Sequence, residues 1–246
     1  MSTFVLVPGA WHGSWCWKRV RTALQALGHE VFTPALTGVG ERAHLLSREI
    51  NLDTHIDDVV NLIRWEGLSD VVLCGHSYGG AVVAGAADRV PECIGALVYL
   101  DAFVLENGQS VHDTLPPAVR DLQLELARDV GDGWKVPPIP AEAFNVNTAD
   151  RAWVDRQCTM HPLATFQQPL TLNGRFSTPQ NTSFILATGF VESPFSPFYE
   201  RARALGWATA TVSCGHDVML DQPQELVDIL VGAAPTIQRC TARART

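Results

Sequence analysis

Short apolar runs alternate with segments of helical character through most of these 246 residues, and this alternation limits the fold more than any other feature. Buried strands appear as brief apolar runs, whereas helices place apolar residues three and four positions apart. The strand-like runs are 3–7, 30–36, 70–75, 94–103, 183–188 and 208–214. The helix-like segments are 14–28, 53–67, 78–90, 196–206 and 222–234. Such alternation predicts an α/β fold with a mostly parallel sheet covered by helices on both faces.

One long segment, 104–180, departs from this pattern. It contains the proline cluster "VPPIP" and two helix-like stretches, 116–130 and 148–158, without a regular series of strands. A compact domain rarely contains an unstructured loop of this length. We therefore predict a single structural domain whose core is formed by 1–103 and 181–246, with 104–180 inserted as a helical cap after the strand that ends at Asp101.

Charge and composition exclude several classes of protein. The net charge of −8 opposes binding to nucleic acid or to an anionic membrane, since both need a basic face. The N-terminal apolar run lacks the basic start of a signal peptide, and no stretch is long enough for a membrane span. Reduced thiols in the cytoplasm are the simplest interpretation of cysteines that form no CxxC pair and no zinc pattern. These are Cys16, Cys74, Cys93, Cys158, Cys214 and Cys240.

The stretch "VVLCGHSYGG" places Ser77 between a buried strand and the helix that follows. A G-x-S-x-G match is weak alone, but this strand–turn–helix setting is the one in which such a serine becomes a nucleophile. Gly75 and Gly79 then have a steric purpose, because side chains there would collide with the neighbouring backbone. We predict that Ser77 is a nucleophile. The alternative is a glycine-rich junction with an incidental serine.

A serine hydroxyl needs a base, and His216 is the best placed of the eight histidines. It follows the last strand-like run, in "TVSCGHDVML", and the order serine then histidine is typical of this arrangement. His76 adjoins the serine, where neighbouring side chains of a sharp turn point apart. His161 lies in the predicted cap, where packing or substrate contact is expected.

An oxyanion hole requires two backbone N–H donors. We predict the amide of Tyr78, which follows the nucleophile, and the amide of Ala10, in the loop after the first strand. Pro8 in that loop has no N–H, and Gly9 allows close approach. The first strand and the Ser77 strand are expected to be neighbours where the chain reverses direction across the sheet, since ligand crevices form there.

At this point the chain resembles a known family. The stretches "VLVPGAWHGSWCW", "GHSYGG" and "CGHDVMLDQPQEL" are similar to the α/β-hydrolase branch of plant methylesterases, plant hydroxynitrile lyases and bacterial pyrethroid-hydrolase-like carboxylesterases. "LTGVGERAHLL", "YLDAFV" and "HPLATFQQPLTL" resemble the bacterial members most. The resemblance covers nearly the whole chain. It implies the α/β-hydrolase fold, with about six core strands and a helical lid over Ser77.

The sequence departs from the family at the acid of the triad. The family's usual aspartate lies past the penultimate strand, where this chain has Gly189 or Phe190. A carboxylate must still orient His216. We predict Asp101, because an aspartate that closes an apolar strand is costly to bury without a partner. Glu192 is the alternative acid, and Asp217 is expected to face elsewhere.

The predicted reaction is hydrolysis of a small to medium apolar or aromatic carboxylic ester through an acyl-enzyme, without metal or organic cofactor. Lactone hydrolysis by the same triad stays open, as does a homodimer. Cyanohydrin cleavage is disfavoured, since the related lyases have a lysine and a threonine where this chain has Asp217 and Gly9. Ser77 argues against dehalogenases and epoxide hydrolases, which use an aspartate. A ligand-binding receptor is the non-enzymatic alternative. The residues predicted to contact substrate are Trp11, His76, Trp134, Trp153 and Phe190.

Overall fold

The computed structural model describes residues 1–176, 181–190 and 193–234. Six strands form one sheet in which every neighbouring pair is parallel, in the order β2-β1-β3-β4-β7-β8. The predicted fold class is thereby confirmed, with all strand pairs of this sheet parallel. The strands are β1 Thr3–Val7, β2 Glu30–Phe32, β3 Val71–His76, β4 Ile94–Leu100, β7 Thr182–Ala187 and β8 Ala208–Val212.

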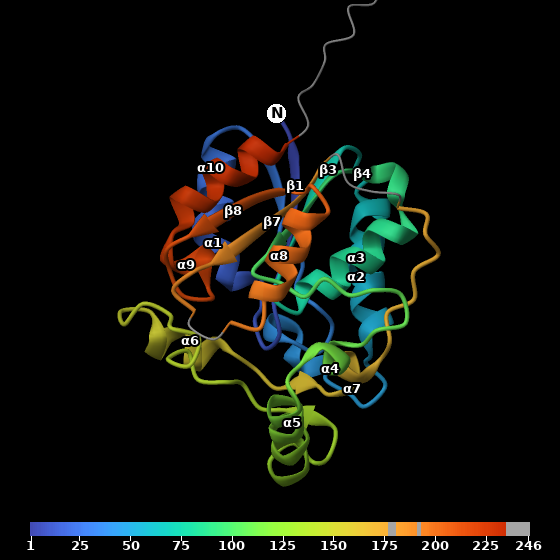
Figure 1. The fold of residues 1–246 in the computed structure, drawn as a ribbon, viewed down its shortest axis with the longest axis vertical. Coiled ribbons are helices and arrows are strands. Elements are labelled where there is room, and N and C mark those ends of the chain that lie inside the picture. Colours follow the sequence, from blue (N-terminus) through green and yellow to red (C-terminus); the bar gives the residue numbers. More distant parts are fainter. Residues whose placement is uncertain (177–180, 191–192, 235–246) are drawn as a thin grey trace, which may run out of the picture.

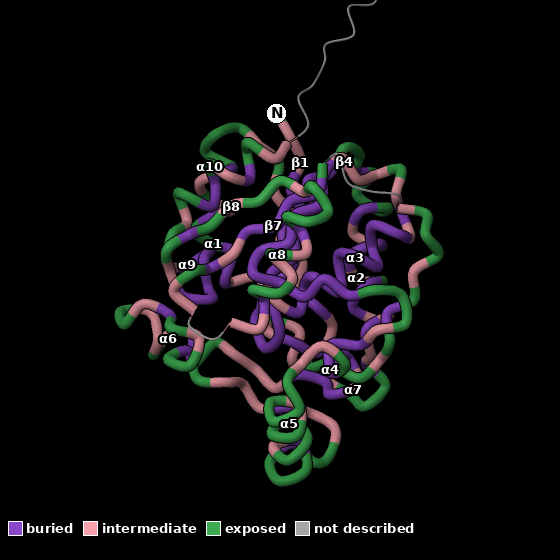
Figure 2. The backbone as a smooth tube through the Cα atoms, in the orientation of Figure 1, coloured by how far each residue is buried: buried purple, intermediate pink, exposed green. Residues whose placement is uncertain are grey.

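Helices cover both faces of this sheet (Figure 1). Alternate strand residues point to opposite faces, so Val5 and Leu73 pack on one side while Leu6 and Cys74 pack on the other. The first face is covered by α2 Leu52–Trp65, α3 Gly79–Arg89 and α8 Ser196–Ala204, and the second by α1 Lys18–Ala26 and α10 Pro223–Ala233. Figure 2 shows the buried strands between these layers.

The chain between β4 and β7 contains the predicted helices and one unpredicted feature. The helix expected near 116–130 is α5 Pro117–Asp129, and the one expected near 148–158 is α6 Arg151–Gln157. A short antiparallel pair joins β5 Lys135–Val136 to β6 His161–Pro162. The sequence did not predict these strands, because two residues per strand are too few to show an alternation of apolar and polar residues. The short helices here are α4 Val111–Thr114 and α7 Ala164–Gln167. The division into core and cap stays a prediction.

Four further short helices lie in the connections of the core. They are η1 Ser14–Trp17, η2 Gly40–Leu45, η3 Pro91–Cys93 and α9 Val218–Asp221. None of the helices within the described ranges has the length and apolar character needed to cross a membrane.

The switch point of the sheet lies between β1 and β3. These strands are neighbours, with Val7 opposite Gly75 at their carboxyl ends. From there β1 leads to β2 on one side, whereas β3 leads to β4 on the other. The two following loops therefore diverge and leave a crevice between them. This arrangement confirms the predicted neighbours and brings the "PGAW" loop beside Ser77.

Candidate active site

Ser77 lies on a strained turn between β3 and α3. Its φ of +54° is a left-handed conformation that non-glycine residues rarely adopt. Its amide donates to the carbonyl of Leu100 at 3.2 Å, and its carbonyl accepts from Phe103 at 3.2 Å. The sheet and the segment after β4 thus hold both polar backbone groups of Ser77. Backbone strain maintained in this way is common at catalytic residues.

The glycines around Ser77 permit this turn. A Cβ at Gly79 would lie 2.7 Å from the carbonyl oxygen of Pro8. A Cβ at Gly75 would collide with the backbone carbonyl of Gly79, and one at Gly9 would lie 2.9 Å from the Cβ of Ser77. Close backbone approach therefore explains the glycines on both sides of the serine and in the loop after β1.

Replacement of Gly79 by alanine is expected to lower the free energy of unfolding by about 1–3 kcal/mol, because the backbone around the added methyl group cannot yield easily. Urea unfolding measures the change. Gly232→Ala in α10 is the matched control, since no atom lies within 4 Å of the added Cβ. There alanine should be neutral or stabilising by up to about 1 kcal/mol. Equal stability of Gly79→Ala and the parent would contradict the steric explanation.

His216 and Asp101 form a buried pair behind this turn. Nδ1 of His216 lies 2.6 Å from Oδ2 of Asp101, and the carboxylate is fully buried. The other oxygen of Asp101 accepts from the amide of Ala187 at 3.1 Å. Asp101 also has a left-handed backbone, with φ of +42°. The carboxylate is therefore held from two sides and can accept a hydrogen from Nδ1 of His216.

Aromatic rings surround the imidazole of His216. Phe195 stacks on it at 5.0 Å between centroids and 4° between planes. Phe144 and Phe190 lie at 5.1 and 5.2 Å. The amide of His216 donates to the carbonyl of Phe144 at 2.9 Å. The ring is thus confined, and with Nδ1 directed to Asp101 only Nε2 is available for proton transfer.

Glu192, the alternative acid, lies outside the described residues. Gly189 is one of the two positions, with Phe190, at which the resemblance places the family's usual acid, and the backbone leaves no room for a side chain at Gly189. A Cβ at Gly189 would lie 2.6 Å from the carbonyl oxygen of Cys214, and the Gly189 amide donates to that oxygen at 2.8 Å. No side chain fits there without a backbone shift.

The amides of Ala10 and Tyr78 have no acceptor within the described part of the chain. Free N–H groups at this place are what an oxyanion hole requires. The Tyr78 ring is fully buried, and its hydroxyl lies 2.9 Å from Nδ1 of His55. Burial lowers the pKa of His55 to about 4, so this ring is neutral at pH 7. His55 anchors Tyr78 and was not among the sequence-predicted residues.

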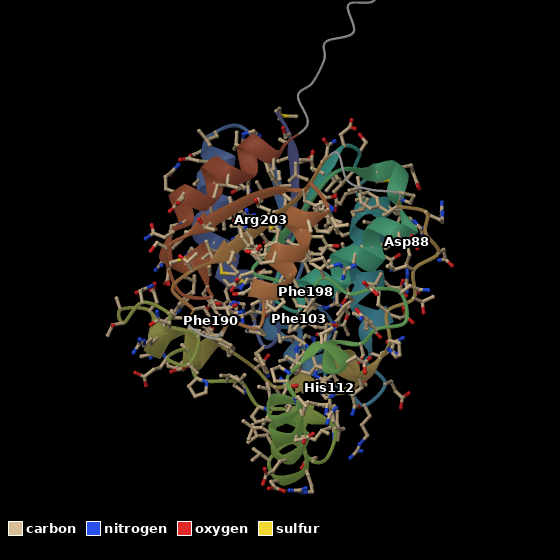
Figure 3. All side chains as sticks on the ribbon, viewed as in Figure 1. Asp88, Phe103, His112, Phe190, Phe198 and Arg203 are labelled. Atoms are coloured by element: carbon tan, nitrogen blue, oxygen red, sulfur yellow. The ribbon has the colours of Figure 1, made fainter. Side chains whose placement is uncertain are left out.

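One cavity of about 620 Å³ joins the predicted groups. Ser77, His216, Ala10 and Tyr78 all line it, as do Trp11 and Phe190 from the predicted substrate contacts. Figure 3 shows Phe103 and Phe190 between the sheet and the helices after β4, with His112 further toward α5. Most of the remaining lining is apolar. It includes Phe103, Val111, Leu115, Val119, Ile139, Phe144, Phe166 and Phe195.

The prediction that His76 contacts substrate is not supported, because His76 does not line this cavity. Its ring is fully buried, and Nε2 donates to the carbonyl oxygen of His216 at 3.0 Å. Burial, followed by the nearby His216, lowers the pKa of His76 well below its ordinary value. The role of His76 is therefore to hold the backbone of His216 through this hydrogen bond.

The two predicted tryptophans of the insert also lie away from the cavity. Trp153 packs edge-on against Trp15 at 5.0 Å and borders a separate surface hollow. Trp134 lies under the guanidinium of Arg48 at 5.4 Å. The sequence could identify these residues as aromatic, but only the path of the chain decides which aromatic rings face the cavity.

Several known proteins are similar to this chain in sequence. A family model described as "Alpha/beta hydrolase family" matches residues 4–229. A carbendazim-hydrolysing esterase from Nocardioides sp. (strain SG-4G) is 46% identical over 241 residues, which are 94% of this chain and 98% of that protein. Methylesterase 1 of Arabidopsis thaliana is 34% identical over 109 residues, covering 44% and 41% of the two chains.

Solved structures give the same result for the fold. An extracellular alpha/beta-hydrolase from a Paenibacillus species has a TM-score of 0.84 at 25% identity, covering 96% of this chain and 100% of that chain. A pyrethroid hydrolase from Sphingobium faniae JZ-2 has a TM-score of 0.74 at 19% identity, covering 95% and 97%. The second likeness concerns the fold alone.

Proposed function

Because this chain belongs to the alpha/beta hydrolase family, we propose that it is a serine carboxylesterase in which Ser77 is the nucleophile and His216 the base. Asp101 orients His216, and the amides of Ala10 and Tyr78 form the oxyanion hole. The observation that carries this proposal is the single cavity lined by Ser77, His216 and both free amides, with Asp101 hydrogen-bonded to His216. The resemblance to the esterase branch is confirmed by the family match and the long esterase relative.

In the proposed mechanism the Ser77 hydroxyl attacks the ester carbonyl while Nε2 of His216 takes its proton. The carbonyl oxygen becomes negative and accepts hydrogen bonds from the two free amides. His216 then protonates the departing alcohol, which leaves an acyl group on Ser77. Water, deprotonated by His216, attacks this acyl group and releases the acid. Asp101 holds the correct tautomer of His216 throughout.

The cavity favours an ester with a flat aromatic group. Rings of Trp11, Phe144 and Phe166 come from three separate segments and border the same space. The long esterase relative is named as a carbendazim-hydrolysing esterase. Carbendazim is therefore the first candidate substrate. The segment 104–180 is proposed as the cap that selects among such compounds.

Two features favour ester hydrolysis over cyanohydrin cleavage. Asp217, at the position of the lyases' lysine, is fully buried and pairs with His12 at 3.1 Å. Gly9, at the position of their threonine, has no room for a side chain beside Ser77. Hydrolysis of a lactone by the same triad remains the alternative reaction.

Steady-state hydrolysis of p-nitrophenyl acetate tests the proposal against a receptor that only binds its ligand. A panel of aryl, alkyl and methyl esters, lactones and carbendazim then identifies the substrate class. We expect turnover that fluorophosphonate labelling of Ser77 abolishes, with aryl esters preferred. Binding of these compounds without any turnover would favour the receptor instead.

Gln123 is a polar side chain in the largely apolar cavity, and its hydrogen bond to a substrate would fix the orientation in which that substrate binds. Gln123 of α5 lines the cavity, and its carbonyl oxygen accepts from Nε2 of His112 at 3.0 Å. Burial lowers the pKa of His112, which keeps the ring neutral and one nitrogen as a donor. No described residue accepts a hydrogen bond from the NH₂ group of Gln123. This group can donate to an acceptor on the substrate.

Gln123→Met is therefore expected to reduce discrimination between two esters that differ by one ring nitrogen, such as methyl quinoline-carboxylate and methyl naphthoate. The kcat/KM ratio of the two should fall about 3- to 10-fold, which corresponds to one hydrogen bond. Paired steady-state assays measure this ratio. An unchanged ratio would show that Gln123 does not contact this part of the substrate.

We propose that the protein is cytoplasmic. Sedimentation velocity distinguishes a monomer from the homodimer that the sequence analysis left open. The five cysteines of the described residues are free, which agrees with a reducing compartment.

A further inference from the structure

His12 is a buried histidine for which the proposed mechanism has no role. Its relative exposure is 2%. Nδ1 lies 2.8 Å from the carbonyl oxygen of Ala10, and Nε2 lies 3.1 Å from Oδ2 of Asp217. The carbonyl oxygen accepts, and the Asp217 carboxylate accepts when it is ionised, so both ring nitrogens then carry a hydrogen. The lowered pKa of Asp217 favours this ionised form, and the contacts therefore fit the positively charged form of His12.

Asp217 is the matching buried anion. It is fully buried, and His12 is the one residue in the described ranges that donates a hydrogen bond to its side chain. Burial raises the pKa of Asp217, but the charge of His12 and its hydrogen bond outweigh this effect and lower it. Burial lowers the pKa of His12, and Asp217 outweighs that and raises it. The two side chains thus form an ion pair removed from solvent.

One end of this pair holds the loop that carries Ala10. Both polar atoms of the peptide group between Ala10 and Trp11 form hydrogen bonds. Its oxygen accepts from His12, and its N–H donates to Nδ1 of His161 at 3.2 Å. Trp11 has a φ of +65°, which a tryptophan does not adopt without support. The free amide of Ala10 belongs to the preceding peptide group, so its direction depends on this support.

The other end of the pair holds the loop that carries His216. Asp217 follows His216 directly, and the carbonyl oxygen of His216 accepts from Nε2 of His76 at 3.0 Å. Oδ1 of Asp217 lies 4.0 Å from the same nitrogen of His76. The ion pair consequently links two segments more than 200 positions apart, since His12 and Asp217 are separated by 205 residues.

We propose that the His12–Asp217 ion pair is a positioning device that sets the Ala10 amide of the oxyanion hole relative to His216. This inference rests on the proposed function. An oxyanion donor must already point to the place where negative charge develops, and a small misplacement weakens catalysis more than substrate binding. His12 and Asp217 are positioning residues here, because they act through Ala10 and His216.

The test uses Asp217→Asn, His12→Gln and the double variant in the full-length protein. Asparagine keeps the shape of Asp217 but removes the charge that keeps His12 doubly protonated. Glutamine has only one NH₂ group with which to reach two acceptors. Each single variant should lower kcat for p-nitrophenyl acetate about 10- to 100-fold with KM within about 3-fold, as expected for an interaction specific to the transition state.

Two further measurements separate positioning from simple stability. A trifluoromethyl ketone, which forms an anionic adduct with the serine, should lose affinity in proportion to kcat/KM. The double variant should be no slower than the slower single variant, because both changes remove the same unit. Asp88→Asn is the control. Asp88 is 3% exposed and accepts from the amides of Asn173 and Arg175, away from the cavity. This change should lower the Tm while kcat per folded molecule stays unchanged.

The possible results separate the two proposals. Folded single variants with the parent's kcat and inhibitor affinity would overturn the positioning role alone. Variants that fail to fold, or whose activity falls only with the folded fraction, would assign the pair to stability and overturn it also. A parent protein without Ser77-dependent turnover would overturn the proposed function itself.

Discussion

Ser77→Ala is expected to lower kcat for p-nitrophenyl acetate by roughly 10⁵- to 10⁶-fold, the loss seen when the serine of a serine–histidine unit is removed. The reason is chemical, since no acyl-enzyme can form without the hydroxyl. The free amides of Ala10 and Tyr78 would still stabilise, to a limited extent, the oxyanion that forms when water attacks the ester carbonyl. Stopped-flow and steady-state assays measure the rate, and a fluorophosphonate probe reports whether the serine is labelled.

The matched control is Ser183→Ala. This serine is buried within β7, whereas Ser77 is partly exposed and lines the cavity, and the Oγ of Ser183 has no partner among the described residues. Removal of that hydroxyl should leave both turnover and labelling near the parent values. Turnover that survives Ser77→Ala within about 10-fold, far above the residual rate expected without a nucleophile, would rule out the proposed mechanism.

Asp101→Asn is expected to lower kcat by about 10³- to 10⁴-fold while the protein stays folded. The carboxylate accepts a hydrogen from Nδ1 of His216 at 2.6 Å. An asparagine NH₂ directed at Nδ1 would force that nitrogen to be an acceptor and place the hydrogen on Nε2. His216 could then no longer take the proton of Ser77. Steady-state kinetics with circular dichroism of the folded protein measure the effect.

Glu192→Gln provides the contrast for this experiment. We expect it to change kcat by less than about 3-fold, because a carboxylate that does not orient the histidine contributes little to the transition state. If Glu192→Gln caused the large loss and Asp101→Asn did not, Glu192 would be the acid and the Asp101–His216 hydrogen bond would be structural.

The sequence determined the fold and much of the candidate site by local rules. Strand–helix alternation predicted the parallel sheet, and the "GHSYGG" turn predicted that Ser77 would follow a buried strand. These inferences succeeded because residues close in sequence decide where a strand ends and which turn is sterically possible. The position of β1 beside β3 was also predicted, because ligand crevices of α/β sheets form where the chain reverses direction across the sheet.

Only the tertiary structure decided which distant side chains meet. It brought Asp101, one of the two acids that the sequence offered, against His216. It also paired His12 with Asp217 and turned Trp134 and Trp153 away from the cavity. The sequence shows which side chains are aromatic or charged, but it does not show which other residues those side chains contact. These contacts matter for stability because they are buried. A charged or polar side chain that is removed from water is stable only where it pairs with a group from another segment.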